Sequence, residues 1–339
     1  MKPSLRLTAI FMVLFVLLLS ASATMAADPG LAYPPESEAT DTKAGSLLYY
    51  NAYTSVPAGD TANTKINVTN TNDQSGVAIH VFFVDGSSCS VADYYICLTA
   101  NQTYSFYASD YDPGFSGYIV MIAVDRQGIP RNFNFLTGDE FIRYDSGFIA
   151  NLGAIAFSKL TNDNVISGDR SQAAIFFDGQ QLAGSYNRAP RVVELDSIAS
   201  KADSNDTLMI LNRVGGNLGT GAASLGSMFG LLYDDVENSY SFSISGGCQL
   251  RTVLSDTSPR TAPRFGSIIP TGRTGWMKIW GLGDIGILGA MINKNPNQAS
   301  RTAFNGGHNL HALKLTPSAQ LTIPVFEPSC IVNENDPVM

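Results

Sequence analysis

The chain has 339 residues, of which 45% are hydrophobic and only 15% are charged. This composition is typical of a globular protein rather than a disordered one, and the length allows two domains with cores of their own. The net charge of −8 and the lack of a basic stripe argue against nucleic-acid binding, because an acidic surface repels phosphate backbones.

The N-terminus carries the pattern of a secretory signal peptide over residues 1–26. Lys2 and Arg6 precede Leu7–Leu19, a run that is apolar apart from Thr8, and small residues follow as far as Ala27. The run is shorter than the roughly 20 residues that a spanning helix needs, so we expect cleavage near Ala26 or Ala27. No second long apolar segment follows, and we therefore predict no membrane span after leader cleavage. The mature protein is expected to be exported, to the periplasm, the cell surface or the medium.

Residues 27–45 contain Pro, Glu and Asp without hydrophobic periodicity, and we expect a disordered mature N-terminus there. From residue 46 to 136 the pattern is that of strands. Ile66 and Val68 alternate with polar residues, Val77–Val84 is largely apolar on both faces, and Gly117–Val124 is a continuous apolar run. Short strands at this spacing predict a first antiparallel β-sandwich of the Ig-like type.

Residues 137–205 are expected to connect two domains and to contain the few helices of the chain. Apolar residues recur at helical spacing in Phe148–Leu160, which predicts a helix there, although Gly153 disfavours it. A second, shorter helix is predicted over Val192–Lys201.

Residues 206–330 repeat the strand pattern and predict a second Ig-like β-sandwich, followed by a C-terminal tail at 331–339. Gly275–Leu282 carries both tryptophans, and Ile285–Ile292 is apolar. The two halves share an order of features, including a strand that ends in Asp85 in one half and in Asp234 in the other. The predicted fold is therefore all-β, with two antiparallel sandwiches and an order of strands that would fit a duplication.

Four cysteines in an exported chain predict two disulfides. Three pairings are possible, and the sequence alone excludes none of them. The short spacing between Cys89 and Cys97 favours a bridge between those two, which leaves Cys248 to pair with Cys330. Zinc binding by the cysteines is disfavoured, because no C-x-x-C spacing occurs.

Four stretches of residues 62–160 are distinctive together: Val81–Asp93, Leu98–Thr103, Ala108–Gly114 and Gly117–Asp125. With them the chain resembles a family of uncharacterised exported bacterial proteins, over about a third of its length. The resemblance implies export and an all-β fold. It implies no activity, and it assigns no site residue.

One motif would suit a secreted serine hydrolase. Ala222–Gly226 differs from the G-x-S-x-G nucleophile elbow at its first position, and Ser224 is followed in hydrolase order by Asp234 or Asp256 and then by His308 or His311. The elbow should lie between a buried strand and a helix, whereas Ser224 lies in a glycine-rich loop. We therefore favour the simpler interpretation, that Ser224 lies in a flexible loop without catalytic function.

Two further motifs could bind a cofactor or a metal. Gly281–Gly286 fits the dinucleotide pattern G-x-G-x-x-G, but no acidic residue follows at the required distance, so we expect a hairpin turn between two buried strands. His308 and His311 could share a metal ion on a helix. On a strand, residues three apart point to opposite faces, and we predict no metal site there.

Candidate ligand sites remain in two places. Asp110 and Asp112 lie in one compact loop, and Asp93 could approach them to bind calcium, although a solvated turn is the simpler interpretation. Aromatic residues offer interface candidates, since Tyr and Trp combine an apolar body with a polar tip. These candidates are Trp276, Trp280, Tyr104 and Tyr107.

The sequence thus favours an exported, non-enzymatic protein with a structural or adhesive role at the cell surface. Its partner would be a second copy of the chain or a cell-surface molecule. The alternatives are a binding module for a polysaccharide or another extracellular ligand, and a secreted hydrolase that uses Ser224. No cofactor is expected, and calcium is the one alternative that the sequence leaves open.

Overall fold

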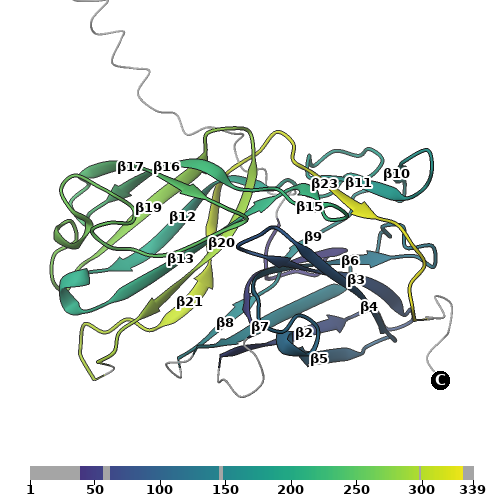
Figure 1. The fold of residues 1–339 in the computed structure, drawn as a ribbon, viewed down its shortest axis with the longest axis horizontal. Coiled ribbons are helices and arrows are strands. Elements are labelled where there is room, and N and C mark those ends of the chain that lie inside the picture. Colours follow the sequence, from purple (N-terminus) through teal and green to yellow (C-terminus); the bar gives the residue numbers. More distant parts are fainter. Residues whose placement is uncertain (1–38, 56–61, 145–147, 298, 331–339) are drawn as a thin grey trace, which may run out of the picture.

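The computed structural model describes residues 39–55, 62–144, 148–297 and 299–330, and within these ranges it is almost entirely β-structure (Figure 1). The signal peptide, most of the 27–45 segment and the 331–339 tail lie outside the described residues. The only helical elements described are three 3₁₀ turns: η3 (Ala108–Asp110), η4 (Lys201–Asp203) and η5 (Phe265–Ser267). No helix in the described ranges is both long and apolar enough to cross a bilayer.

The first half of the molecule, residues 47–157, forms a five-stranded and a four-stranded antiparallel sheet. The first five-stranded sheet has the order β4-β3-β6-β1-β9, and the first four-stranded sheet has the order β5-β2-β7-β8. Their strands are β1 (Leu47–Thr54), β2 (Asn63–Asn70), β3 (Val77–Asp85), β4 (Val91–Leu98), β5 (Thr103–Tyr107), β6 (Ser116–Val124), β7 (Leu136–Arg143), β8 (Ile149–Gly153) and β9 (Ile155–Phe157).

The second half, residues 190–315, repeats this order strand for strand. The second five-stranded sheet is β17-β16-β19-β12-β22, and the second four-stranded sheet is β18-β13-β20-β21. Their strands are β12 (Pro190–Ala199), β13 (Asp206–Val214), β16 (Gly226–Tyr233), β17 (Ser239–Gly246), β18 (Gln249–Val253), β19 (Thr274–Gly281), β20 (Gly286–Lys294), β21 (Gly306–Asn309) and β22 (His311–Leu315). The repeated order supports the duplication that the sequence suggested.

Register fixes which residues correspond in the two halves. Strand β1 has a one-residue bulge between Tyr50 and Tyr53, where it pairs with β6, and β12 has the same bulge between Leu195 and Ile198, where it pairs with β19. The residue that follows each bulge faces a glycine. A Cβ on Gly117 would lie 1.8 Å from the carbonyl oxygen of Val84, and one on Gly275 would lie 2.4 Å from that of Tyr233. Both positions therefore require glycine for the same close approach of two strands.

A fifth sheet, which we call the cover sheet, has the order β10-β11-β23-β14-β15 and includes one parallel pair, β14 with β23. Its strands are β10 (Val165–Ile166), β11 (Gln172–Phe176), β14 (Gly216–Asn217), β15 (Gly221–Ala222) and β23 (Gln320–Pro324). In Figure 1 the C-terminal chain leaves the second half and crosses to the first half, where β23 lies beside β11.

Buried side chains fill four layers. One layer lies between the two sheets of the first half and another between the two sheets of the second half. A third lies between the first five-stranded sheet and the cover sheet, where Tyr118 and Val120 meet Ile175 and Ile323. The fourth joins the halves, where Ile142 and Leu152 pack against Ile210 and Ile292. The outer face of the first five-stranded sheet is thus as buried as its inner face.

The segment expected to connect two domains instead supplies strands to both halves. The predicted helix over Phe148–Leu160 is wrong, because these residues form β8 and β9, with Ala150 and Leu152 buried and Ile149 and Asn151 exposed. The same apolar residues fit both a helical and a two-residue period. They form strands because β8 pairs with β7 and β9 pairs with β1. The helix over Val192–Lys201 is wrong as well, since β12 occupies most of it.

The N-terminal boundary also differs from the prediction. Residues 39–45 were expected to be disordered, but Thr40 forms a β-bridge to Ala156 and Gly45 forms one to Leu136. Order therefore begins before residue 46 within the described chain.

The expected hairpin at Gly281–Gly286 is also wrong. Strand β19, before the turn, belongs to the second five-stranded sheet, and β20, after it, belongs to the second four-stranded sheet. The turn therefore crosses from one sheet to the facing one.

All four cysteines are in disulfides, but the favoured pairing of Cys89 with Cys97 and Cys248 with Cys330 is wrong. The bridges are Cys89–Cys248 and Cys97–Cys330, with Cα–Cα distances of 5.2 and 6.0 Å. Cys97 lies in the extended strand β4, which begins at Val91, two residues after Cys89. The extended chain from Val91 to Cys97 spans roughly 20 Å, whereas a disulfide needs Cα atoms within about 7 Å. Two disulfides are consistent with an exported protein.

Candidate functional site

The outer face of the second five-stranded sheet carries aromatic and charged side chains in register. Met277 and Ile279 of β19 point into the core, so Trp276, Lys278 and Trp280 lie on the outer face. The neighbouring strand β16 contributes Phe229, Leu231 and Tyr233 to this face, and β17 contributes four exposed serines at every second position, Ser239, Ser241, Ser243 and Ser245. We call this surface the open face.

Ring contacts organise the open face into two aromatic pairs. Trp276 stacks on Tyr233 with 4.5 Å between ring centroids, and Trp280 lies 5.2 Å from the ring of Phe229. Lys278 lies between the tryptophans along β19, with its ammonium group 5.8 Å from the centre of the Tyr233 ring. Trp276 and Trp280 are partly exposed, so both sequence-predicted tryptophan candidates lie on one surface.

A charged row crosses the same face. Lys278 of β19 lies directly opposite Glu194 of β12, which in turn lies opposite His311 of β22. The pKa of Glu194 is raised, chiefly by burial; His311 opposes this rise and the negative charge of Asp196 adds to it. The row therefore places a cation, a carboxyl group and an imidazole side by side.

At the end of this row, Asp196 meets two histidines. Its Oδ1 lies 2.5 Å from Nε2 of His308, and its Oδ2 lies 3.9 Å from Nε2 of His311. The two imidazole centroids are 5.8 Å apart. Asp196 lies in the bulge of β12, which turns its side chain out of the regular alternation.

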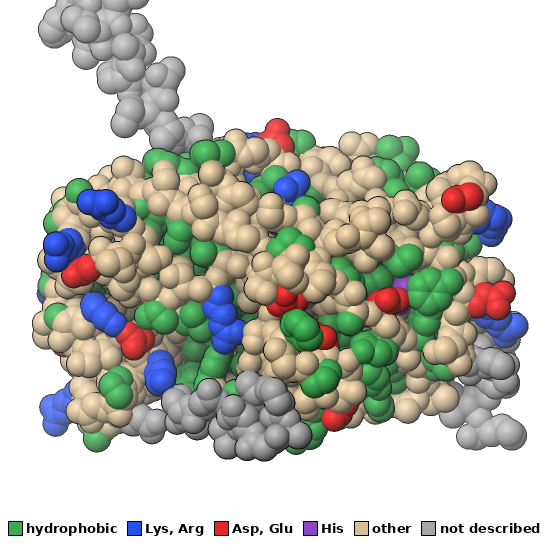
Figure 2. All heavy atoms as spheres, viewed as in Figure 1, with side chains coloured by type: hydrophobic (Ala, Val, Ile, Leu, Met, Phe, Trp, Pro, Cys, Tyr) green, Lys and Arg blue, Asp and Glu red, His purple; other side chains and the backbone are tan. Residues whose placement is uncertain are grey.

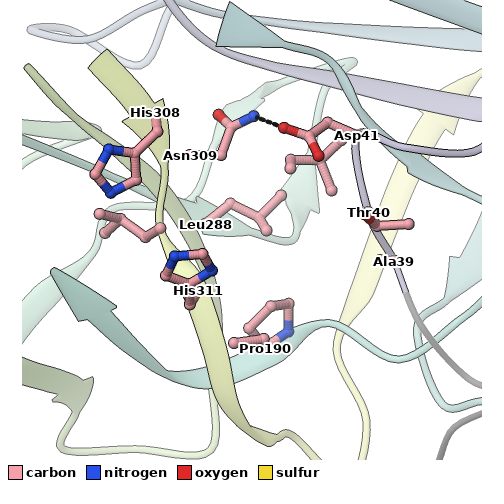
Figure 3. Close-up of a pocket in the computed structure, with 11 residues that line it drawn as sticks. Ala39, Thr40, Asp41, Pro190, Leu288, His308, Asn309 and His311 are labelled. Carbon is pink, nitrogen blue, oxygen red and sulfur yellow. Dashed lines mark hydrogen bonds between the residues drawn. The ribbon is translucent and has the colours of Figure 1, made fainter. Parts of the chain in front are cut away.

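The prediction that His308 and His311 point to opposite faces is wrong. That prediction assumed one continuous strand. Instead β21 pairs with β20 and ends at Asn309, while β22 pairs with β12 and begins at His311. The chain changes sheets at Leu310, so the alternation is interrupted and both imidazoles reach Asp196. Figure 3 shows His308 on one side of the strand and Asn309 on the other, where it donates to Asp41 at 2.7 Å.

Two cavities flank the histidines. One has about 470 Å³, and its lining includes Ile155, Leu288 and both histidines. Figure 3 shows Asp41 facing the two histidines across it. The second has about 490 Å³ and is lined by residues 304–308 together with Asp196, Asn293 and His311. Both histidines are therefore accessible to small solutes.

The proposed hydrolase triad is not hydrogen-bonded within the part of the chain that the structure describes. Ser224 is exposed in the loop before β16, where its carbonyl oxygen accepts from Arg213. Within the described residues, its hydroxyl has no hydrogen bond to any histidine. His80 pairs with Asp93, and His308 pairs with Asp196.

The three calcium candidates have separate partners. Asp93 accepts from His80 at 2.8 Å, Asp110 accepts from the backbone of Tyr107, and Asp112 accepts from the Tyr53 hydroxyl. Over the ranges that the structure describes, the one group of three such side chains close enough to share a metal ion is Asp196, His308 and His311. The acidic loop is therefore held together by side-chain-to-backbone and side-chain hydrogen bonds.

The tyrosine candidates lie on the first half. Tyr104 is half-buried and shares a hydrogen bond of 2.9 Å with the hydroxyl of Tyr111, whereas Tyr107 is 51% exposed. They are not part of the open face. On the face of the molecule in Figure 2, charged side chains are scattered among uncharged ones and form no continuous basic stripe.

Sequence analysis missed Asp196 and Glu194 as site residues. An acidic pair in Val192–Lys201 was assigned to a helix, and no spacing in the sequence connects it to histidines more than a hundred positions later. The one available signal was the pair Glu194 and Asp196, two positions apart after an apolar run. Such pairs are common on strands that have no binding or catalytic function.

Comparisons with known proteins show no family for this chain. No protein-family profile and no curated protein matches it. Among solved structures, Thermotoga maritima protein 1070 is 10% identical over 34% of this chain and 96% of its own, with a TM-score of 0.26. A cowpea mosaic virus empty particle covers 94% of this chain and 98% of its own at 9% identity (TM-score 0.17), and a Pleurotus ostreatus lectin in complex with GalNAc covers 92% and 89% at 8% identity (TM-score 0.16).

Proposed function

We propose that the protein is an exported, non-enzymatic binding protein that attaches to extracellular polysaccharide through the open face. In this proposal the two pairs of facing sheets are two sandwich domains of one repeated design. The first is stabilised by the cover sheet, and the second presents the ligand surface. An adhesive role at the cell surface would follow from such binding.

The observation that supports this proposal is the contrast between corresponding faces. By register, Trp276 and Trp280 occupy the places of Tyr118 and Ile122, which are buried under the cover sheet. Aromatic rings that stay partly in water forgo part of the stabilisation that full burial would give, and clustered, partly exposed aromatic residues are a frequent sign of a binding surface.

A carbohydrate suits the chemistry of this surface. Sugar rings present apolar C–H faces, which pack on indole and phenol rings, and hydroxyl groups, which exchange hydrogen bonds with polar side chains. The serine row of β17 and the carboxyl group of Glu194 lie on either side of the aromatic pairs. The face could therefore contact both the apolar and the polar edges of a sugar chain.

Intrinsic fluorescence tests the proposal directly, because the chain has only two tryptophans and both lie on the open face. We expect titration with polysaccharides and their oligosaccharides to change tryptophan emission for a binding ligand. The Trp276→Ala and Trp280→Ala variants should weaken binding, measured by affinity electrophoresis, by at least about tenfold each.

Tyr107→Ala is the matched control, since it removes an exposed aromatic residue from the first half. Binding that survives both tryptophan variants but is lost in Tyr107→Ala would place the ligand on the first half instead. A panel of extracellular polysaccharides that leaves tryptophan emission unchanged and shows no retardation would contradict the proposal.

A further inference from the structure

The group of Asp196, His308 and His311 has the donor atoms of a transition-metal site. Each residue offers one ligand atom, and these three atoms all lie within 4.8 Å of one another. Two imidazole nitrogens and one carboxylate oxygen are a set that divalent zinc and its neighbours in the first transition row prefer, whereas calcium prefers oxygen ligands alone.

The distances suit a single bound ion. Zinc lies about 2.0–2.2 Å from nitrogen and oxygen ligands, so two ligand atoms on one tetrahedral ion are roughly 3.3 Å apart. The two carboxylate-to-imidazole distances, 2.5 and 3.9 Å, lie on either side of that value. The shorter distance involves Oδ1 of Asp196 and the longer one Oδ2, so both imidazoles would shift on binding one ion.

The hydrogen bond between Asp196 and His308 does not account for His311. At 3.9 Å its Nε2 is too far from the carboxylate for a hydrogen bond, yet the chain places it beside the other two groups. The side chains of Asp196 and His308 are each more than a third exposed, and that of His311 is 61% exposed. An ion here would keep open positions for water or for a ligand donor from either flanking cavity.

The arrangement belongs to the second half alone. By register, Asn51 occupies the place of Asp196 in the first half, and Leu152 and Ile155 occupy the places of His308 and His311. Both halves therefore have the same two backbone features: a bulge in β1 and in β12, and a change of sheets between β8 and β9 and between β21 and β22. Only the second copy carries metal-binding side chains on them.

We propose that Asp196, His308 and His311 bind one divalent transition-metal ion, with zinc as the preferred ion in an exported protein. The proposal does not depend on the polysaccharide proposal, because its evidence is the ligand geometry rather than the aromatic face. Glu194, opposite His311, is the nearest further carboxyl group on the same strand.

Isothermal titration of the mature, tag-free protein, first dialysed against EDTA, tests this proposal. We expect zinc chloride to bind with one-to-one stoichiometry and micromolar or tighter affinity, and calcium chloride not to compete. Cobalt chloride should give visible d–d absorption bands, which report nitrogen and oxygen ligation at a site with few ligands.

His308→Gln, His311→Gln and Asp196→Asn should each weaken zinc binding by at least about tenfold and abolish the cobalt bands. Asp73→Asn, which changes an exposed carboxylate of the first half, is the matched control and should leave both signals unchanged. Circular dichroism would verify that each variant is folded. The proposal is overturned by the absence of one-to-one zinc binding, or by wild-type affinity in the folded His308→Gln/His311→Gln double variant.

Discussion

The two halves share one strand order, but the outer face of the five-stranded sheet is covered in the first half and partly exposed in the second. In the first half, the outer face of the five-stranded sheet is apolar and lies under the cover sheet. In the second half, the corresponding face carries Trp276, Lys278 and Trp280 and is partly exposed. Since the backbone order is the same, the difference lies in side chains and in what packs on them.

This comparison separates structural from functional positions. Gly117 and Gly275 are the same in both halves because the backbone requires glycine at each. Val120 and Lys278 correspond and differ, because one contacts the cover sheet and the other faces solvent. At this pair of positions the covered half needs apolar packing and the open half does not.

The largest expected effect concerns the disulfides: one joins the two halves, and the other joins the first half to the segment after β23. Cys89–Cys248 connects residues 159 apart in sequence, and Cys97–Cys330 connects residues 233 apart. Loop-entropy arguments give each bridge about 5 kcal/mol at most, by restricting the unfolded chain. Replacing Cys89 and Cys248 together by serine should therefore lower the free energy of unfolding by about 3–5 kcal/mol in urea titrations.

The paired variant Cys89→Ser/Cys97→Ser distinguishes this pairing from the one that the sequence favoured. It breaks both observed bridges, so it should destabilise the protein more than Cys89→Ser/Cys248→Ser. Equal destabilisation by the two double variants would contradict the connectivity.

The next prediction compares the cost in unfolding free energy of an alanine substitution at the covered face with that at the open face. Ile175 of the cover sheet is fully buried, so Ile175→Ala should cost about 3 kcal/mol of unfolding free energy through lost contacts and a residual cavity. Leu231→Ala on the open face removes a similar volume from a partly exposed site and should cost below about 1 kcal/mol. Equilibrium urea unfolding measures both, and similar costs would show that the open face is packed like a core.

A smaller effect concerns Glu140, a buried carboxyl group in the first half where Met291 stands in the second. Its Oε1 accepts from the backbone of Ala52 in the bulge of β1, and burial raises its pKa well above 4.5. The folded state thus holds a proton that the unfolded state releases above about pH 4.5. Stability should therefore fall as pH rises from there, by at most about 1.4 kcal/mol per unit.

Glu140→Gln keeps an acceptor for the bulge but cannot ionise, so it should flatten this part of the pH profile. Urea unfolding at several pH values between 4.5 and 7.5 measures the slope. An unchanged slope in the variant would assign the pH dependence to other groups.

The smallest effect concerns His80, whose place in the second half is taken by Phe229. Burial lowers the pKa of His80 below 6.5, although its partner Asp93 opposes this shift. The unfolded state therefore binds a proton near pH 6.5 that the folded state binds only at lower pH, and stability falls as pH drops below 6.5. His80→Phe should reduce that fall in thermal unfolding between pH 6.5 and 5, an effect opposite in sign to that of Glu140. A steeper fall in the variant would contradict the assignment.

The sequence predicted the strands well because alternation reflects burial on one face, as in Tyr240, Phe242 and Ile244. It predicted helices wrongly where small and apolar residues fit both periods, as in Phe148–Leu160. It could not predict the disulfides or the site of Asp196, because both depend on how distant strands meet. Neither the bulge in β12 nor the change of sheets at Leu310 has a residue pattern that a single sequence would reveal.

Hydroxyl-radical footprinting with mass spectrometry tests the central claim, that corresponding faces are covered in one half and open in the other. We predict that Trp276 and Trp280 are oxidised in the native protein, while Tyr49 and Tyr118, at the covered face, become oxidised only after unfolding. Protection of both tryptophans to the same degree as Tyr118 would contradict the account.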